Sequence, residues 1–281
     1  MQINNIYTSF NINQKSFYPS FASTRAQTLD KAGNVLYCNY TNLNREDLDW
    51  GKFARFLNYR FQNQEHVNIN LHGCSDGSDA YTLSMNLIKE LGNGAKKFFP
   101  ILASDISESV IKTAQAGKIL LHKKDLDYLD KMGARHYFER DYNSPVQVMH
   151  DIEFFPHKVN KSLKDTVDFS IKDVMKSAQK RDISDEVFMF RNGWTFNTLE
   201  KQNQLAKDLS KNSNKKTLVV IGQSDLFKSG ASDALQRNGF RGIKSEIFAQ
   251  KETIYPSISI GKPITSPSYQ KEYLLFEKSW N

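Results

Sequence analysis

Cysteine is scarce in this chain of 281 residues, which contains only Cys38 and Cys74. The two form neither a Cys-x-x-Cys motif nor part of a Cys/His cluster, so a disulfide framework and a zinc site both lack their minimum ingredients. We therefore expect reduced thiols and no metal site.

Long apolar runs are missing as well. No stretch approaches the roughly 20 apolar residues of a membrane-spanning helix. The opening residues, MQINNIYTSFNINQKSFYPS, have no apolar run behind a basic start, as a secretory signal would have. The sequence therefore predicts a cytoplasmic protein that does not insert into a membrane.

The composition is that of a globular protein with a basic balance. The chain is 39% hydrophobic and 12% aromatic, which is enough for one α/β core with some length left over. The formal net charge of +7 favours acidic partners in general, but it does not distinguish nucleic acid, a membrane surface and an acidic protein. We expect one main domain with appendages.

The first part of the chain differs from the rest. Residues 1–35 are rich in Asn, Ser, Gln and Thr without a sustained period, which indicates a polar, flexible leader before a folded domain over 36–281. Between Leu48 and Phe61 the aromatic and aliphatic residues fall at helical spacing, which predicts an amphipathic helix that faces the core.

From residue 67 on, strand and helix patterns alternate. Apolar and polar residues alternate over 67–72, and the loop GCSDGSD then leads into an apolar helix pattern that stops at Gly92. The unit repeats, with FFPILASD as a strand and SESVIKTAQAG as a helix that Ser107 caps and Gly117 ends. Further strands are expected at 167–170, 186–190, 217–222, 242–250 and 272–278, with helices at 172–180 and 198–210.

This alternation predicts an α/β fold with a doubly wound, mostly parallel sheet. In such sheets a ligand binds at the carboxyl ends of the strands, near the point where the strand order reverses. Over 118–163 the rhythm changes to a short charged helix pattern and alternating strand pieces, which predicts a small inserted subdomain.

Two features after the predicted strands suit a cofactor that carries adenosine. Gly73 and Gly77 let the first loop approach a ligand closely, and Asp105 ends the second strand, where it can accept hydrogen bonds from a ribose diol. Each signal alone is weak, since such turns are common and an Asp after a strand is as often a helix cap.

Five motifs in order make a family resemblance. The run GCSDGSDAYTLSM resembles the Gly-Cys-Ser-Thr-Gly-Glu-Glu-Pro-Tyr-Ser motif of the CheR-type chemotaxis receptor methyltransferases. ILASDISESVIKTAQAGKI, FRNGWTF and LVVIGQSD resemble later motifs of that family, and NYTNLNR has the spacing of its Asn-x-Thr-x-x-x-Arg motif. The resemblance implies a Rossmann-like class I methyltransferase fold and S-adenosyl-L-methionine as cofactor. It also implies O-methylation of glutamate on an acidic protein such as a chemoreceptor helix, so nucleic acid is not an expected partner.

The same resemblance assigns roles to individual residues. Arg45 is expected to close over the methionine end of the cofactor and to pair with the incoming carboxylate, while Phe196 replaces a tyrosine that lies near the family's active site. The cofactor-binding positions that the resemblance implies are Asn39, Thr41, Arg45, Gly73, Asp79, Asp105, Ile106, Asp173, Val174, Asn192 and Gly193. Read without the resemblance, Arg45 suits a surface salt bridge with Glu46 or Asp49, and Asn192 suits a turn.

The chemistry requires little from the protein. A methyl group on a sulfonium is already activated, so transfer to a carboxylate needs an ionised, oriented acceptor, and an arginine beside that acceptor provides both. No general base is needed. The absence of a Ser/His/Asp set is therefore consistent with methyl transfer.

Departures from the family pattern keep two alternatives open. Asp76 replaces a threonine, Ser78 and Ala80 replace Glu and Pro, and Phe196 lacks the tyrosine hydroxyl. Such changes suit either a tuned enzyme with a different substrate or a weakly active or inactive cofactor-binding signalling or scaffold protein, and Phe196, Ser78 and Ala80 favour the latter. A methyltransferase of nucleic acid or of a small molecule is favoured only by the net charge of +7, and the Asn/Asp-Pro-Pro-aromatic loop that holds a flipped base is absent.

Overall fold

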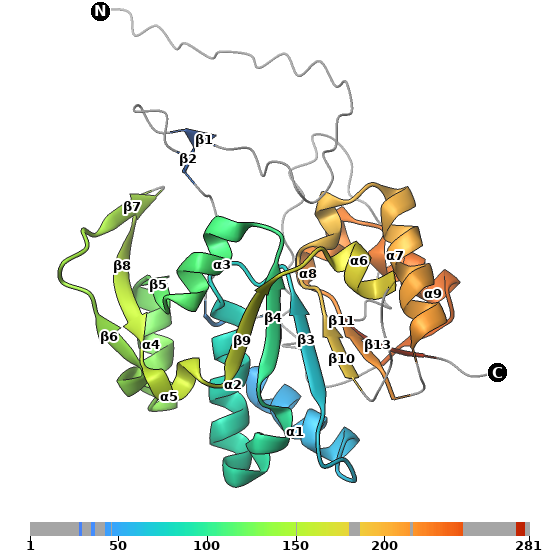
Figure 1. Cartoon of the computed structure of the whole chain (residues 1–281), viewed down its shortest axis with the longest axis horizontal. Helices are drawn as coiled ribbons and strands as arrows, with labels where there is room; N and C mark the ends of the chain where they lie inside the picture. Colours follow the sequence, from blue (N-terminus) through green and yellow to red (C-terminus); the bar gives the residue numbers. More distant parts are fainter. Residues whose placement is uncertain are drawn as a thin grey trace, which may run out of the picture.

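A seven-stranded sheet forms the centre of the protein in a computed structural model (Figure 1). Its strands are β3 (Asn68–His72), β4 (Ile101–Asp105), β9 (Val167–Ile171), β10 (Glu186–Met189), β11 (Leu218–Val220), β12 (Phe240–Gly242) and β13 (Leu275–Lys278). The structure describes residues 28–29, 35–36, 43–45, 47–149, 151–179, 186–213, 216–243 and 274–278.

The strand order is β12-β13-β11-β10-β3-β4-β9. Neighbouring strands from β11 to β9 run parallel, and β13 pairs antiparallel with both β11 and β12. From β3 the chain runs outward through β4 to β9 and then returns to place β10 on the other side of β3. The order therefore reverses between β3 and β10, which confirms the predicted doubly wound, mostly parallel sheet.

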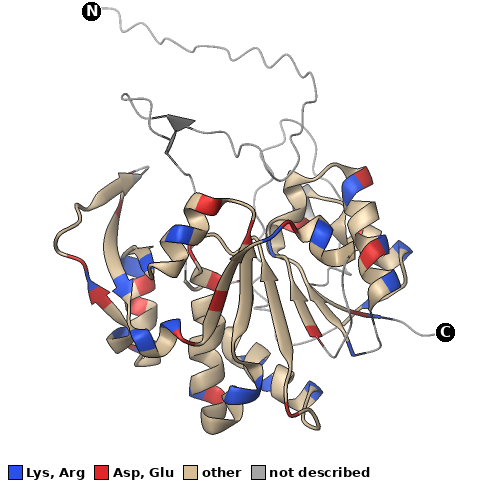
Figure 2. Cartoon of the chain, in the orientation of Figure 1, with Lys and Arg blue, Asp and Glu red and all other residues tan. Residues whose placement is uncertain are grey.

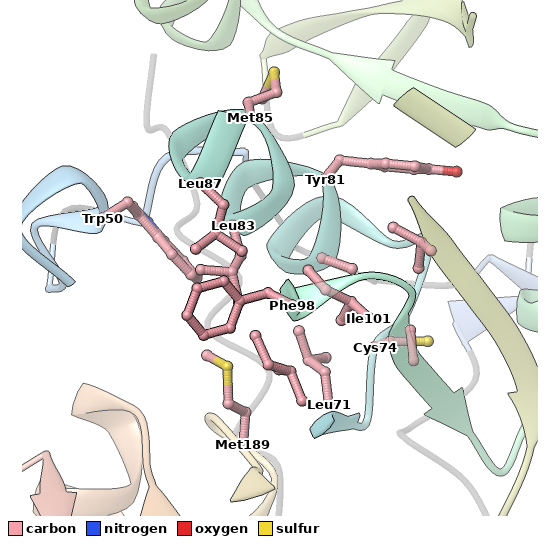
Figure 3. Packing of buried hydrophobic residues seen from close by; sticks show 14 of the residues in the cluster. Trp50, Leu71, Cys74, Tyr81, Leu83, Met85, Leu87, Phe98, Ile101 and Met189 are labelled. Atoms are coloured by element: carbon pink, nitrogen blue, oxygen red, sulfur yellow. The ribbon is translucent and has the colours of Figure 1, made fainter. Parts of the chain in front are cut away.

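Helices cover both faces of the sheet because successive side chains on a strand point to opposite faces. On β10, Val187 and Met189 belong to one core, while Phe188 belongs to the other. The first core contains residues of α1 (Trp50–Arg60), α2 (Ser78–Leu91), α3 (Glu108–Gln115) and the 3₁₀ turn η1 (Gly92–Phe98), and Figure 3 shows part of this packing. The second contains residues of α6 (Val174–Gln179), η3 (Trp194–Phe196), α7 (Leu199–Asn212) and α9 (Ala231–Arg237).

Helix boundaries follow the predicted pattern with one correction. The helix α2 ends before Gly92, which has a φ of 53°, and α3 ends just before Gly117, which has a φ of 67°. The correction concerns Ser107, which occupies the N-cap position of α3 but makes no side-chain capping bond. The carboxylate of Asp105 accepts the Ser107 N–H at 3.0 Å, which forms an Asx turn at the entry to α3 and does not replace the missing side-chain cap.

A second, antiparallel sheet lies beside β9 at the side of the central sheet (Figure 1). Its strands are β5 (Lys118–Leu121), β6 (Phe138–Arg140), β7 (Gln147–Met149) and β8 (Ile152–Val159), with β8 paired to the other three. The same stretch contains α4 (Lys123–Met132), η2 (Arg135–Tyr137) and α5 (Lys161–Lys164). Leu129 of α4 is buried in the first core, so this inserted subdomain packs on the main domain.

Parts of the predicted leader and of one predicted strand lie outside the described residues. Of the polar leader, the structure describes β1 (Thr28–Leu29) and pairs it with β2 (Val35–Leu36). Of the strand predicted over 242–250, only residues 242 and 243 are described, and Gly242 is the last residue of β12. Within the described part of the chain, no helix has both the length and the apolar character needed to cross a bilayer.

Candidate functional site

The loop after β3 has an unusual backbone. Gly73, Ser75 and Gly77 have φ angles of 66°, 53° and 91°, and the value for Ser75 is uncommon for a residue with a side chain. A Cβ atom at Gly77 would lie 2.7 Å from the ring of Phe169, so glycine is required there by space as well as by conformation. Strained loops of this kind persist where the surrounding structure holds them, often at functional sites.

Asp105 joins this loop to the end of β4. Its Oδ2 accepts the N–H of Ser75 at 3.1 Å, and its Oδ1 accepts the N–H of Ser107 at 3.0 Å. Each oxygen of an ionised carboxylate has more than one acceptor position, so Asp105 keeps capacity for ligand hydroxyls. The hydroxyl of Ser75 is buried and has no hydrogen-bond partner among the described residues.

Arg191, directly after the Phe190 that follows β10, is a buried cation between two carboxylates. Its Nη1 donates to Asp79 Oδ2 at 2.9 Å, its Nη2 donates to Asp47 Oδ1, and its guanidinium carbon lies 4.7 Å from the centre of the Trp50 ring. Burial disfavours the charged form, but the charges of Asp47 and Asp79 outweigh burial and raise the pKa of Arg191. A permanent positive charge is thus fixed at the carboxyl end of β10.

Arg45 approaches the same carboxylate from another direction. Its Nε lies 3.6 Å from Asp79 Oδ1, and its side chain is 23% exposed. That Oδ1 atom is buried and accepts no hydrogen bond among the described residues. Asp49, one of the partners considered for Arg45 from the sequence, forms an ion pair with Lys52. Asp79 therefore has a charged neighbour on each side and one oxygen with unused acceptor capacity.

Asp76, in the loop after β3, is an acid with a raised pKa. Asp76 Oδ1 accepts both the N–H of Ser78 at 3.0 Å and its hydroxyl at 2.6 Å. Burial raises the pKa of Asp76 to about 6, although the bonds from Ser78 and the charge of Arg45 oppose this increase. The replacement of the family's threonine thus places an acid that changes charge near pH 6 next to Asp79.

The turn after Arg191 is held by another buried carboxylate. Asn192 has a φ of 57°, and its N–H donates to Asp225 Oδ2 at 2.6 Å. Its side-chain oxygen accepts the N–H of Ser224 at 2.9 Å, near the start of α8 (Gln223–Lys228). Burial raises the pKa of Asp225 to about 6, although backbone N–H donors, Gly222 first among them, oppose the shift. These bonds hold Asn192 in the turn, and a Cβ atom on the next residue, Gly193, would collide with the ring of Phe190.

The other predicted residues are distributed around this edge of the sheet. Lys172 N–H donates to the Asp105 carbonyl at 3.0 Å, so Asp173 follows at the same sheet edge, where its Oδ1 accepts the N–H of Met175 at 2.9 Å. The side chain of Val174 is buried in the second core, Ile106 is half-buried and Phe196 is 44% exposed. Asn39 and Thr41 lie outside the described residues.

The structure thus brings most of the predicted residues to one edge and adds three that the sequence analysis did not assign. These are Asp47, Arg191 and Asp225. Arg191 and Asp225 stand inside two of the motifs, FRNGWTF and LVVIGQSD, and this position could have identified them as site residues. Nothing in the sequence marks Asp47 in the same way. Among the described residues, no group of three or more His, Cys, Asp or Glu side chains is placed to hold a metal ion.

Comparison with known proteins identifies a family over most of the chain. The family model described as CheR methyltransferase, SAM binding domain, matches residues 39–241. A comparison with curated proteins gives no match.

Similarity to solved structures is distant. Magnesium protoporphyrin IX methyltransferase from Synechocystis PCC 6803 with bound SAM is 14% identical over 72% of this chain and 74% of that chain, with a TM-score of 0.37. Precorrin-6y C5,15-methyltransferase from Geobacter metallireducens GS-15 is 12% identical over 68% of this chain and 72% of that chain, with a TM-score of 0.33. At these scores neither similarity bears on the substrate, and the fold class is established by the strand order and the family match.

Proposed function

The chain belongs to the CheR methyltransferase family through its SAM-binding domain, and on that basis we propose that it methylates glutamate carboxylates of an acidic protein such as a chemoreceptor helix. The observation that carries the proposal is the position of Arg45. Its partly exposed guanidinium lies beside Asp79 at the edge of the sheet where the glycine-containing loop and Asp105 meet. A carboxylate that approaches this edge meets a cation that can fix its orientation.

The residues at this edge fit S-adenosylmethionine, the cofactor of the family. Asp105 has acceptor capacity for the two ribose hydroxyls, and the left-handed backbone at Gly73 and Gly77 permits close approach. Two buried polar atoms without hydrogen-bond partners among the described residues, Ser75 Oγ and Asp79 Oδ1, can pair with polar groups of the ligand. When bound, the cofactor supplies a methyl group that its sulfonium has already activated.

The protein's own contribution is to hold and ionise the acceptor. The charge of Arg45 favours the ionised form of a nearby glutamate, and its N–H groups fix the carboxylate so that one lone pair is free to attack. Asp79, which the buried Arg191 holds at 2.9 Å, positions Arg45 from the opposite side. No proton needs to be removed, so the site works through placement and exclusion of water.

A second candidate function is a cofactor-binding protein with little or no turnover. It is favoured by Phe196, which has no hydroxyl to contribute, and by the existing proximity of Arg45 to Asp79, with which an acceptor must compete. Methylation of nucleic acid receives no comparable support. In Figure 2 the positions of Asp and Glu (red) alternate with those of Lys and Arg (blue) along the helices of the described residues.

The proposal is tested in two steps. Isothermal titration calorimetry with S-adenosylmethionine and S-adenosylhomocysteine should show binding of both to the natural protein and loss of binding in Asp105→Ala. Radiolabelled methyl transfer to acidic helical peptides should then yield base-labile esters with the natural protein and far fewer with Arg45→Ala, measured at a cofactor concentration that saturates both proteins. Binding without ester formation supports the second candidate, and absence of binding refutes both.

A further inference from the structure

Residues 43–45 and 47, called here the Arg45 segment, are anchored at their start by two distant elements. The N–H of Leu43 donates to Asp125 Oδ1 of α4 at 3.1 Å, although 82 residues separate the two. The carbonyl of Leu43 accepts the hydroxyl of Thr82 from α2, and the Leu43 side chain is fully buried in the first core. Both backbone polar groups of one residue are thus fixed, one by the inserted subdomain and one by the main domain.

The other end of the segment is anchored at the carboxyl ends of the strands. Asp47 Oδ1 accepts from the buried guanidinium of Arg191, and its Oδ2 accepts the N–H of Gln223 at 3.0 Å. These donors follow β10 and β11 respectively. Arg45 lies two residues from each anchor, and a chain spans at most about 3.5 Å per residue, so its backbone has little freedom to move.

Asp125 is suited to hold the first anchor. Its side chain is 2% exposed. Its Oδ2 accepts the backbone N–H of His122 at 3.1 Å, while the His122 ring accepts the N–H of Asp125 at 3.1 Å. This reciprocal cap fixes the carboxylate at the start of α4 and leaves Oδ1 directed at Leu43. The anchor therefore has the rigidity of a capped helix.

From these contacts we infer that Asp125 is a positioning residue for Arg45, through which the inserted subdomain sets where the arginine meets the acceptor carboxylate. The inference rests on the proposed function in that Arg45 is taken to contact the acceptor. Asp125 itself acts only through the backbone of Leu43. Its replacement should loosen the Arg45 segment and impair methyl transfer without removing any group that touches the cofactor.

The hydrogen bond between Leu43 and Asp125 is tested first, by a measurement that does not depend on activity. Hydrogen exchange followed by mass spectrometry should show the 43–47 peptide exchanging about tenfold faster in Asp125→Ala, because this variant removes the acceptor of the Leu43 N–H. Asn160→Ala is the matched control, since Asn160 caps α5 of the same subdomain by accepting the N–H of Leu163 and does not contact Leu43 through that bond. Unchanged exchange in Asp125→Ala, or equal acceleration in the control, would overturn the inference.

The natural protein provides a measurement that does not depend on a folded variant. By NMR, the Leu43 amide should exchange about as slowly as the amide of His122, because the Asp125 carboxylate accepts a hydrogen bond from both. An unprotected Leu43 amide would refute the bond between Leu43 and Asp125 even if Asp125→Ala failed to fold.

Activity then distinguishes positioning from a general structural role. Asp125→Ala should lower kcat/KM for an acidic peptide about 10- to 100-fold and leave the affinity for S-adenosylhomocysteine unchanged within about twofold. In an Arg45→Ala background, residual transfer should fall less than about twofold on adding Asp125→Ala, because the two residues act through one contact. An undiminished loss in that background would contradict the inference. If the natural protein transfers no methyl group, the proposed function fails, while the exchange data still decide whether Asp125 holds the segment.

Discussion

The guanidinium of Arg191 and the carboxylate of Asp79 are 2.9 Å apart although 112 residues separate them in the sequence. Arg191 follows β10 and Asp79 lies in the first turn of α2, which follows β3, so the pair joins the two strands between which the sheet order reverses. Because Asp79 also lies beside Arg45, this buried pair fixes the charge distribution at the ligand-binding edge. The predictions below depend on this edge.

Removal of the buried cation should destabilise the fold. In Arg191→Met the carboxylates of Asp47 and Asp79 lose their buried partner, which costs about 3–5 kcal/mol of unfolding free energy. Urea denaturation measures this change. Arg241→Met is the control, because Arg241 is 71% exposed where it pairs with Glu277, and such a pair contributes about 1 kcal/mol or less. Equal losses of unfolding free energy in the two variants would show that the buried Arg191 ion pairs contribute no more than an exposed pair.

The glycine-containing loop should tolerate no side chain at Gly77. Gly77→Ala places a Cβ atom 2.7 Å from the Phe169 ring in a left-handed conformation, so it should reduce both stability and affinity for S-adenosylhomocysteine. Gly133→Ala is matched for conformation, with a φ of 69°, but has no atom within 4 Å of the added carbon. Its unfolding free energy should fall by only about 1–2 kcal/mol, which is the cost of backbone strain. The prediction fails if thermal unfolding and calorimetry rank the two variants alike.

The acid in the same loop should make stability depend on pH. The pKa of Asp76 is about 6 in the folded protein, above its ordinary 3.8, so the folded state binds the proton more tightly than the unfolded state. Its contribution to stability is therefore complete below pH 4 and is lost as the pH rises through about 6. Asp76→Asn, which keeps an oxygen for the Ser78 N–H, should become more stable relative to the natural protein from pH 4 to pH 7. Denaturant unfolding at a series of pH values checks the sign, and a constant difference between the proteins would contradict it.

Restoring the family's hydroxyl should raise activity. The ring of Phe196 is 44% exposed, which leaves room for an added oxygen, and one new hydrogen bond to the reacting groups would increase kcat about tenfold in Phe196→Tyr. Affinity for S-adenosylhomocysteine should stay the same. Phe56→Tyr, on the partly buried face of α1, controls for an added phenol away from the site. A kcat that does not change in Phe196→Tyr would indicate that the missing hydroxyl does not limit transfer.

Much of the fold could be predicted from local patterns. The strands have apolar runs or alternating apolar residues, and helices such as α2 end at a glycine with positive φ, so the order of elements follows from short stretches of sequence. The loop with Gly73 and Gly77, and Asp105 after the next strand, were found in the same way. Ser107 shows the limit of such reasoning, since its local context predicts a cap that its side chain does not make in the structure.

The sequence by itself determined the alternation of strands and helices, the family and the residues that stand in its motifs. Only the tertiary structure decided which polar groups meet: Arg191 between Asp47 and Asp79, and the Asp125 carboxylate against the Leu43 N–H. Periodicity and capping depend on neighbours within a few residues, so a short stretch reveals them. A buried ion pair or hydrogen bond between residues more than 80 positions apart depends on which elements the fold brings together, and no local pattern encodes that.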